Sequence, residues 1–501
     1  MDPRLERQLM INRRQFFGRG AVGIGTAALA SLLAKDLRGA DAVATSAGGT
    51  NPAPAVTSLP PGAGVGGFPN FASKAKRVIY ILQSGGPPHV DMFDYKPKLA
   101  DYRGKDLPPS VQMGQRLSTM TQGQKQIVLP GIAPFKQYGK SGAWVCDYLP
   151  HTGSIVDEVT FVRSMFTTQV NHAPAVTFFL TGSEMPGRPA IGSWLSYGLG
   201  SANENLPAFV VMTSRDRENT CGQLFYDHYW GSGFLPSRYQ GVRIRSGGDP
   251  VLYLTNPAGV SREVRRGVLD DLAKLNELKL QETGDPEIAT RIAQYEMSYR
   301  MQASVPELSD LTTEPKAILD MYGPDVLRPG SFAGNCLRAR RLAERGVRYV
   351  QLMHAGWDHH NNLPTQFKIQ CQDTDQPSAA LVKDLKNRGL LDDTLVVWGG
   401  EFGRTVFGQG DLNNPKVHGR DHHPYCFTIW MAGGGVKKGF SYGASDDFCY
   451  NVAENGVHVH DFQATLLHLL GINHEKLTFR FQGRHFRLTD VHGKVVEPLL
   501  A

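Results

Sequence analysis

The segment VRYVQLMHAGWDHH, residues 347–360, combines the two features that decide the fold. Its first seven residues are rich in β-branched and apolar side chains, which is typical of a buried strand, and histidine and aspartate follow directly. Five other short apolar runs have the same character, at residues 77–82, 159–165, 208–212, 395–398 and 426–431. Helical patterns lie between them, and those at 332–345 and 378–388 end at Gly346 and Gly389, which can cap helices. This alternation predicts an α/β domain with a mainly parallel, doubly wound sheet and flanking helices.

Histidine and carboxylate side chains gather after the predicted strands. Eight of the sixteen histidines fall between His354 and Asp461, in about a fifth of the chain. Parallel strands end at one edge of a sheet, and ligands of such folds bind there. Imidazole nitrogen and carboxylate oxygen together suit a divalent ion such as zinc. The pattern therefore predicts a metal site at this edge, with separate solvated loop histidines as the alternative.

The beginning of the chain has the features of an export signal. Residues 12–17 read NRRQFF, a twin-arginine run, and a weakly apolar stretch at 21–34 and the small-residue sequence ADA at 40–42 follow. The apolar stretch is too short and too rich in glycine to span a membrane. We therefore predict a twin-arginine signal peptide at 1–42, export to the periplasm or the exterior, and no integral membrane span after cleavage.

The rest of the chain divides into a tether and one large domain. Residues 43–73 are rich in Gly, Pro and Ala and predict a flexible linker. Residues 74–501 are long enough for a single α/β domain with a large core. Within it, a charged helical pattern with few apolar positions on any one face predicts a helical hairpin inserted at about 261–303, packed at the sheet edge or over the site.

Charge and cysteine content restrict the class of partner. Residues 1–42 hold seven Lys/Arg and four Asp/Glu, so their removal lowers the formal charge from +6 to +3. That charge is too small to indicate nucleic-acid binding, and no basic stripe interleaved with aromatic residues is present. The six cysteines are widely spaced without a Cys-x-x-Cys motif, so they form no disulfide framework, although some can pair in an oxidising compartment.

Several short motifs together resemble one bacterial family. They are Gly85-Gly86-Pro87, Asp91-Met92-Phe93-Asp94, Asn171-His172-Ala173-Pro174, Gly192-Ser193-Trp194, Gly356-Trp357-Asp358, Glu401-Phe402-Gly403-Arg404-Thr405 and Gly419-Arg420-Asp421-His422. By these motifs the chain is identified as a member of the family catalogued as domain of unknown function 1501, over nearly all of its mature length. That family is grouped with the alkaline phosphatases and sulfatases, which hydrolyse phosphate or sulfate esters at one- or two-metal sites above a parallel sheet. The resemblance implies an alkaline-phosphatase-like core more firmly than it implies a reaction.

The comparison with sulfatases gives three catalytic candidates, Asn171, His172 and Arg404. The sulfatase nucleophile opens a Cys/Ser-x-Pro-x-Arg run with Thr-Gly ten residues later, and the same register here places His172 at the nucleophile and Val176 at the arginine. No covalent Ser, Thr or Cys catalysis is therefore expected. His172 is left to form a phosphoramidate, act as a general base, bind metal or serve as an ordinary loop histidine. Arg404 is suited to hold a phosphate or sulfate oxygen or, alternatively, to pin its loop by a salt bridge.

The same comparison gives the candidate metal ligands. They are Asp91, Asp358, His360, Glu401 and His422. Asp91 would replace an aspartate that the superfamily places directly after the first strand, where this chain has Ser84-Gly85, and Glu401 would keep the carboxylate of a lost Asp-His pair. One well-ligated divalent ion is expected, with zinc preferred and manganese, calcium or magnesium as alternatives.

Supporting roles are expected for three further residues. Arg420 and Asp421 are expected to hold the ligating histidines from behind. Asp461 is expected to be the N-cap of a helix at 462–470, a structural role. His458 and His460, on one face of an extended stretch, remain site candidates.

Three functions are compatible with these residues. The first is an exported metal-dependent hydrolase of phosphate or sulfate esters, in which a metal-activated water replaces the protein nucleophile. The second is a non-catalytic binding protein for sulfated or phosphorylated glycans, and the third is a metal-dependent isomerase or phosphomutase. In each case the partner is a small anionic ester or an anionic glycan. The sequence does not indicate an oligomeric state.

Overall fold

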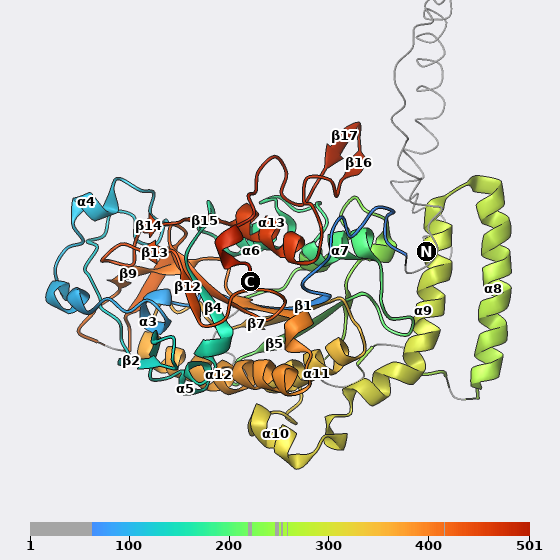
Figure 1. Cartoon of the computed structure of the whole chain (residues 1–501), viewed down its shortest axis with the longest axis horizontal. Coiled ribbons are helices and arrows are strands. Elements are labelled where there is room, and N and C mark those ends of the chain that lie inside the picture. The colour runs from blue at the N-terminus through green and yellow to red at the C-terminus, as the bar shows by residue number, and fades with distance from the viewer. Residues whose placement is uncertain (1–62, 219–222, 246–249, 252–253, 258, 415) are drawn as a thin grey trace, which may run out of the picture. The chain divides into compact units, whose positions relative to one another are not determined.

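A mixed, mostly parallel sheet forms the centre of the protein (Figure 1). The computed structural model describes residues 63–501 except 219–222, 246–249, 252–253, 258 and 415. The main sheet has the order β12-β4-β11-β8-β1-β7-β5-β6, with β15 paired to β4. Its strands are β1 (Arg77–Ser84), β4 (Val159–Phe166), β5 (Phe209–Arg215), β6 (Val242–Arg243), β7 (Tyr349–Ala355), β8 (Thr394–Gly399), β11 (Phe427–Ala432), β12 (Phe440–Tyr442) and β15 (Val457–His458).

The six predicted strands all lie in this sheet. β1 is parallel to β7 and β8, β7 is parallel to β5, and β11 runs antiparallel between β8 and β4. Alternate residues of β1 point to opposite faces, so Ile79 and Ile81 join one apolar core whereas Val78, Tyr80 and Leu82 join the other. The predicted doubly wound, mainly parallel α/β fold is confirmed.

Helices cover both faces of the sheet, as Figure 1 shows. One layer contains α11 (Phe332–Glu344), α12 (Leu363–Asn387) and α10 (Lys316–Tyr322), and the other contains α6 (His172–Thr181), α7 (Ile191–Leu199) and α13 (Val459–Leu469). Shorter elements are α3 (His89–Met92), α4 (Pro109–Gln112), α5 (Pro150–Gly153), β2 (Phe135–Tyr138), β3 (Ala143–Cys146), β9 (Gly403–Gln409), β10 (Gly419–His423), β13 (Ala444–Ser445), β14 (Val452–Glu454), β16 (Phe479–Phe481) and β17 (Arg484–Phe486). Because the loops after the parallel strands β1 and β7 lie at one edge, that edge can assemble a site from distant residues.

Helix α12 begins fifteen residues before the predicted start at 378. Pro377 and the many polar side chains ahead of it favour a loop in the sequence. In the structure two of these polar side chains are buried and partnered: Gln370 Oε1 lies 3.1 Å from His354 Nε2, and Asp375 accepts from the backbone N–H groups of His151 and Thr152 at 2.8 and 2.7 Å. Tertiary hydrogen bonds therefore stabilise a helix that its composition disfavours.

The predicted insertion consists of two long helices. α8 (Arg262–Thr283) and α9 (Pro286–Ser309) are joined by Gly284 and Asp285, and α9 lies between α8 and the rest of the domain (Figure 1). The hairpin packs through α9 on α11 and on the short turn Ser237–Tyr239. The description of this stretch as poor in apolar positions on any face is wrong for α8, which carries an exposed apolar stripe.

The remaining expectations concern the chain ends and the cysteines. The predicted signal peptide at 1–42, residues 43–62 of the predicted linker and Cys221 lie outside the described residues. From Val65 onward the chain is tied to the domain, because the N–H groups of Val65 and Asn70 donate to Tyr197 O and Gly471 O at 3.0 and 2.8 Å. The five described cysteines are buried and unpaired by disulfides. Within the described ranges, no helix combines the length and apolarity that crossing a bilayer requires.

Candidate metal centre

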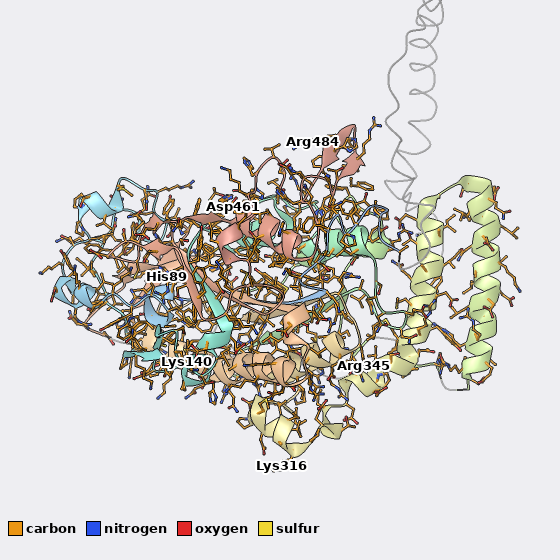
Figure 2. The ribbon with its side chains drawn as sticks, in the orientation of Figure 1. His89, Lys140, Lys316, Arg345, Asp461 and Arg484 are labelled. Carbon is orange, nitrogen blue, oxygen red and sulfur yellow. The ribbon has the colours of Figure 1, made fainter. Side chains whose placement is uncertain are left out.

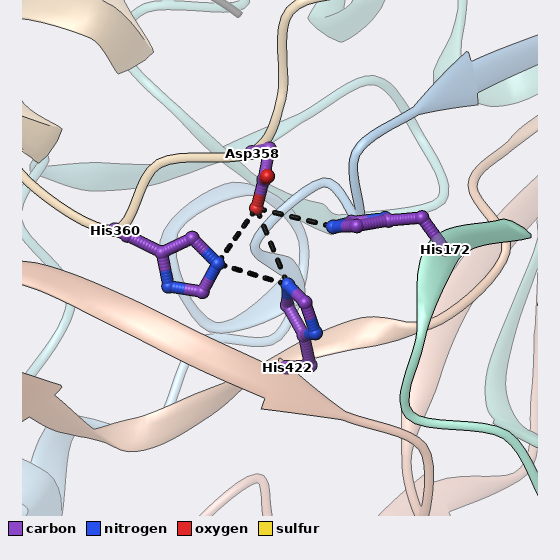
Figure 3. Close-up of side chains that lie close together, drawn as sticks. All are labelled: His172, Asp358, His360 and His422. Carbon is purple, nitrogen blue, oxygen red and sulfur yellow. Dashed lines mark hydrogen bonds and ion pairs between the residues drawn. The ribbon is translucent and has the colours of Figure 1, made fainter. Parts of the chain in front are cut away.

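Four side chains converge at the edge of the sheet where β1 and β7 end (Figure 3). His172 is the first residue of α6, Asp358 and His360 stand in the loop after β7, and His422 lies in β10. One ligand atom from each lies within 4.8 Å of every other, and all four side chains are partly exposed. Three segments far apart in sequence thus present a set of three imidazoles and one carboxylate.

One carboxylate oxygen is the centre of this cluster. Asp358 Oδ1 lies 3.2 Å from His172 Nε2, 2.9 Å from His360 Nε2 and 3.2 Å from His422 Nε2. The Nε2 atoms of His360 and His422 are themselves 2.9 Å apart. All three imidazoles therefore present the same nitrogen to the same oxygen.

The opposite nitrogen of each ring is held by an oxygen. The Nδ1 atoms of His172, His360 and His422 lie 2.5 Å from Glu401 Oε1, 2.8 Å from Gln409 Oε1 and 2.6 Å from Val170 O, respectively. Carboxylate, amide and carbonyl oxygens accept hydrogen bonds, so they place the proton on Nδ1 and leave the Nε2 lone pair facing inward. Three inward lone pairs and a carboxylate oxygen repel one another unless a cation or added protons lie between them. This donor set fits a divalent metal ion, with each imidazole oriented from behind.

The charges around the cluster act on its pKa values. Burial lowers the pKa of His172, but hydrogen bonds to Asp358 and Glu401 outweigh it, so the pKa is raised. Burial opposes the charge on Asp358, yet Arg404 and the three histidines hold its pKa well below the usual value. Burial, with Arg404 and His172 nearby, lowers the pKa of His422 to about 4. Asp358 is therefore an anion and His422 a neutral ligand near neutral pH.

The Arg404 side chain is buried and joins the loops that form the site. Its guanidinium is buried and donates to the carbonyls of Gly85, Gly86 (3.0 Å) and Arg420 (3.0 Å), and to Asp358 Oδ1 at 2.6 Å. The side chain is only 1% exposed. The alternative role of Arg404, a salt bridge that pins its loop, is therefore present in the structure, and its catalytic role stays a prediction.

Glu401 lies behind the four clustered side chains. The sequence instead predicts it to be a metal ligand. It is fully buried, accepts from the Gly85 N–H at 3.0 Å, and contacts His172 Nδ1 at 2.5 Å. The carboxylate therefore orients His172, as carboxylates commonly orient metal-binding imidazoles.

Asp91 lies outside the cluster, which corrects its prediction as a ligand. Its two oxygens accept from Arg420 Nε and Nη2, each at 2.8 Å, in a pair buried from solvent. Asp91 Oδ1 also accepts from the Ile132 N–H at 3.0 Å. These three bonds and the full burial pair the Asp91 charge with Arg420, and Asp91 is not among the four clustered side chains. Arg420 accordingly anchors Asp91 and does not support the histidines.

Three further residues named in the sequence analysis lie outside the cluster. Asp421 accepts from the hydroxyls of Ser118 (2.5 Å) and Thr121 and from the His422 backbone N–H (2.8 Å), so it fixes the backbone near His422 and touches no imidazole. Asp461 lies in the first turn of α13 and accepts from the backbone N–H of His458, which is the N-cap in place of Asp461 (Figure 2). Asn171 is exposed at the N-cap of α6, and no cap bond from its side chain is present.

Some contacts at the site have no signature in the sequence. Val170 contributes a backbone carbonyl, and Gln409 reaches His360 from the end of β9. Gln223 Nε2 donates to the second Asp358 oxygen at 3.1 Å. The sequence does offer a signal for His172 as a ligand, because it replaces the usual nucleophile with a metal-binding residue type.

Fold and centre together define an α/β protein with a three-histidine, one-aspartate metal-type site at the edge of a mainly parallel sheet. The chain belongs to the family described as Protein of unknown function (DUF1501), whose model matches residues 75–500. A comparison with curated protein sequences finds no match.

Solved structures of similar layout include a synthase, a sulfatase and a protein of the alkaline phosphatase superfamily. One is the lipoteichoic acid synthase LtaP from Listeria monocytogenes (10% identity, 83% of this chain and 76% of that chain, TM-score 0.34). Others are the PsFucS1 sulfatase from Pseudoalteromonas sp. (12%, 80% and 68%, 0.33) and a protein in the alkaline phosphatase superfamily from Vibrio parahaemolyticus (10%, 80% and 68%, 0.32). At these scores the likeness carries no substrate or mechanism to this chain, and the chemistry is argued from its own residues.

Replacing Asp358 and His360 together by alanine should strip the metal from the purified mature protein, because two of the four ligands disappear. Elemental analysis after zinc loading measures the loss. Since Asp358 also neutralises Arg404, the pair His360→Ala with His422→Ala should lose metal with a smaller effect on stability. The exposed pair Asp447→Ala with His485→Ala is the control and should keep wild-type zinc. Unchanged zinc in both ligand variants would rule out this site.

Asp91→Asn should lower the free energy of unfolding by about 3–5 kcal/mol, because it leaves the Arg420 guanidinium buried without its anion. Denaturant unfolding of the metal-free protein measures the change, and Asp447→Asn, an exposed carboxylate, should change it by less than about 0.5 kcal/mol. Loss of zinc without loss of stability would restore Asp91 as a ligand.

Proposed function

We propose that this protein holds one divalent ion, zinc by preference, through His172, Asp358, His360 and His422, and that it hydrolyses phosphate or sulfate esters there. The observation that carries the proposal is the convergence of three Nε2 atoms on Asp358 Oδ1 with every Nδ1 already bonded. When bound, such an ion activates water as a nucleophile and neutralises charge on an ester oxygen. The partial exposure of all four ligands leaves room for water and substrate beside them.

The charge of the loaded site favours an anionic substrate. Asp358 and Glu401 contribute two negative charges and Arg404 one positive charge, so a divalent ion makes the centre net positive. His172 is the first residue of α6, a ten-residue helix, so the positive end of the helix dipole adds to this field. A phosphate or sulfate ester is attracted by both.

Hydrolysis in this proposal needs no nucleophile from the protein. Among the described residues, the side chains of the four ligands bond to carboxylate, amide and carbonyl oxygens, to the Arg404 guanidinium, to the Gln223 amide nitrogen and to one another, and to no hydroxyl or thiol. His172 Nε2 faces Asp358 while Nδ1 is held by Glu401, so His172 serves as a ligand and not as an attacking base.

The same absence of a nucleophile also favours a second function, binding of sulfated or phosphorylated glycans without catalysis. The two functions share the metal and the anionic partner, and they differ in turnover. Export by the twin-arginine route, which carries folded proteins, suits both.

Zinc-loaded mature protein should release nitrophenol from p-nitrophenyl phosphate or p-nitrophenyl sulfate. Removal of the ion with a chelator should abolish turnover, and zinc should restore it. His422→Ala should lower kcat/KM by roughly 100-fold or more, whereas the exposed His485→Ala should leave it unchanged. Retention of sulfated or phosphorylated oligosaccharides with no turnover of any ester would favour the binding function instead.

Export is tested independently of the site. Substituting Arg13 and Arg14 by lysine keeps the charge of the NRRQFF run but removes the paired arginines, so the unprocessed protein should accumulate inside the cell. Cell fractionation and the mass of the exported form measure the result, and unaltered export of the lysine variant would contradict the twin-arginine route.

A further inference from the structure

Helix α8 carries an unusual row of exposed aliphatic side chains. Positions four, four, three and three residues apart fall on one side of a helix. The exposed fractions along this row are 55% for Val264, 49% for Val268, 38% for Leu272, 63% for Leu275 and 64% for Leu278. We refer to these five residues as the outer stripe. Figure 2 shows side chains standing out from α8 on the side away from α9.

The opposite side of α8, which packs on α9, is less apolar than the outer stripe. Its inward positions follow a heptad spacing and are Arg266, Leu269, Ala273, Asn276 and Leu280. Only Leu269 among them is a fully buried aliphatic residue, and polar bonds add to the contact. Arg266 makes two hydrogen bonds to Glu296, at 2.9 and 2.5 Å. The solvent-exposed face of α8 is therefore more apolar than the face that packs on α9.

A helix that is apolar on two opposite sides is typical of a bundle in which both sides are covered. In the described residues the outer stripe has no cover, and it runs from Val264 to Leu278, about 21 Å at 1.5 Å per residue. We propose that α8 packs, antiparallel, against α8 of a second copy of this chain, so that two α8–α9 hairpins form a four-helix bundle.

The charged residues around the outer stripe are the reason for proposing a second copy as the partner and an antiparallel direction for the pair. Asp271 and Glu282 lie in line with the outer stripe, and Arg265 and Lys274 flank it. When Val268 of one copy faces Leu278 of the other in antiparallel register, Asp271 lies beside Lys274 of the other copy and Glu282 beside its Arg265. Each contact occurs twice, because a two-fold axis repeats it. In a parallel pair, each of these side chains would lie beside the same side chain of the other copy, so that like charges would meet.

This surface is separate from the metal centre. The ligands come from α6, the loop after β7 and β10, whereas the outer stripe lies on the insertion. The proposal therefore stands without the proposed function and adds an oligomeric state to it.

The mature full-length protein should be a dimer whose mass, measured by sedimentation velocity, falls to that of the monomer on dilution. Leu275→Gln with Leu278→Gln should weaken dimerisation by at least about 100-fold, because four aliphatic side chains leave the interface. These residues are exposed in the monomer and glutamine has good helix propensity, so circular dichroism should show an unchanged fold. Glu277→Gln, between them in sequence but on the other side of α8, should dimerise like the wild type.

The direction is tested by exchanging charges. Asp271 and Lys274 of one helix also pair with each other at 3.4 Å. Asp271→Lys should weaken the dimer, and Asp271→Lys with Lys274→Asp should restore it, because among the two directions only the antiparallel one brings the exchanged charges of the two copies together. A wild-type monomer at all concentrations, or a dimer that persists in the Leu275→Gln, Leu278→Gln protein, would overturn the proposal. Stripe-dependent binding of the monomer to phosphatidylglycerol vesicles would assign the outer stripe to a membrane surface and would overturn it as well.

Discussion

The arrangement of the site depends on one oxygen atom, Asp358 Oδ1. It accepts from the buried Arg404 guanidinium on one side and faces three imidazoles on the other. Arg404 also binds the carbonyls of Gly85 and Gly86 after β1, so the loops after two neighbouring strands are tied to one cation. Gly85 has φ +116°, and a Cβ there would lie 2.5 Å from Asp358 N, so the close approach of the two loops requires glycine.

Three carboxylates at this edge of the sheet take different roles, and the partner that each one contacts decides which. Asp91 is bound on both oxygens by Arg420 and is structural, whereas Glu401 is bound to His172 and orients a ligand. Asp358 alone contacts one arginine and three imidazole nitrogens through a single oxygen. Residues of one chemical type, all plausible ligands in sequence, thus take three separate roles.

With a divalent ion bound as proposed, the cluster would be net positive. An anionic ester would then be attracted by the ion and by the beginning of α6, and the oriented histidines would hold the ion without a nucleophilic hydroxyl. Dimerisation through α8 would leave this edge of the sheet unaltered, because the hairpin contributes no ligand to it.

Local patterns in the sequence were sufficient for the strands and for the edge at which the site lies. The six apolar runs all lie in the main sheet, and Asp358 and His360, which follow the run at 347–353, lie beside His422 of β10. The helix predicted at 378–388 left out the first half of α12, where Gln370, Asp373 and Asp375 have partners far away in sequence. The insertion was expected as a hairpin, but its outer stripe was missed because the abundant charges of α8 obscured the spacing of five aliphatic residues.

The sequence by itself therefore determined the α/β class, the strand positions and the types of residue at the metal centre, since period and composition are local properties. Only the tertiary structure decided that His172 joins the cluster, that Glu401 contacts its far nitrogen, that Asp91 pairs with Arg420 and that Arg404 is buried against Asp358. The reason is physical: an imidazole or carboxylate takes its role from the partner within hydrogen-bond reach, and in this fold the partner is most often hundreds of residues away along the chain.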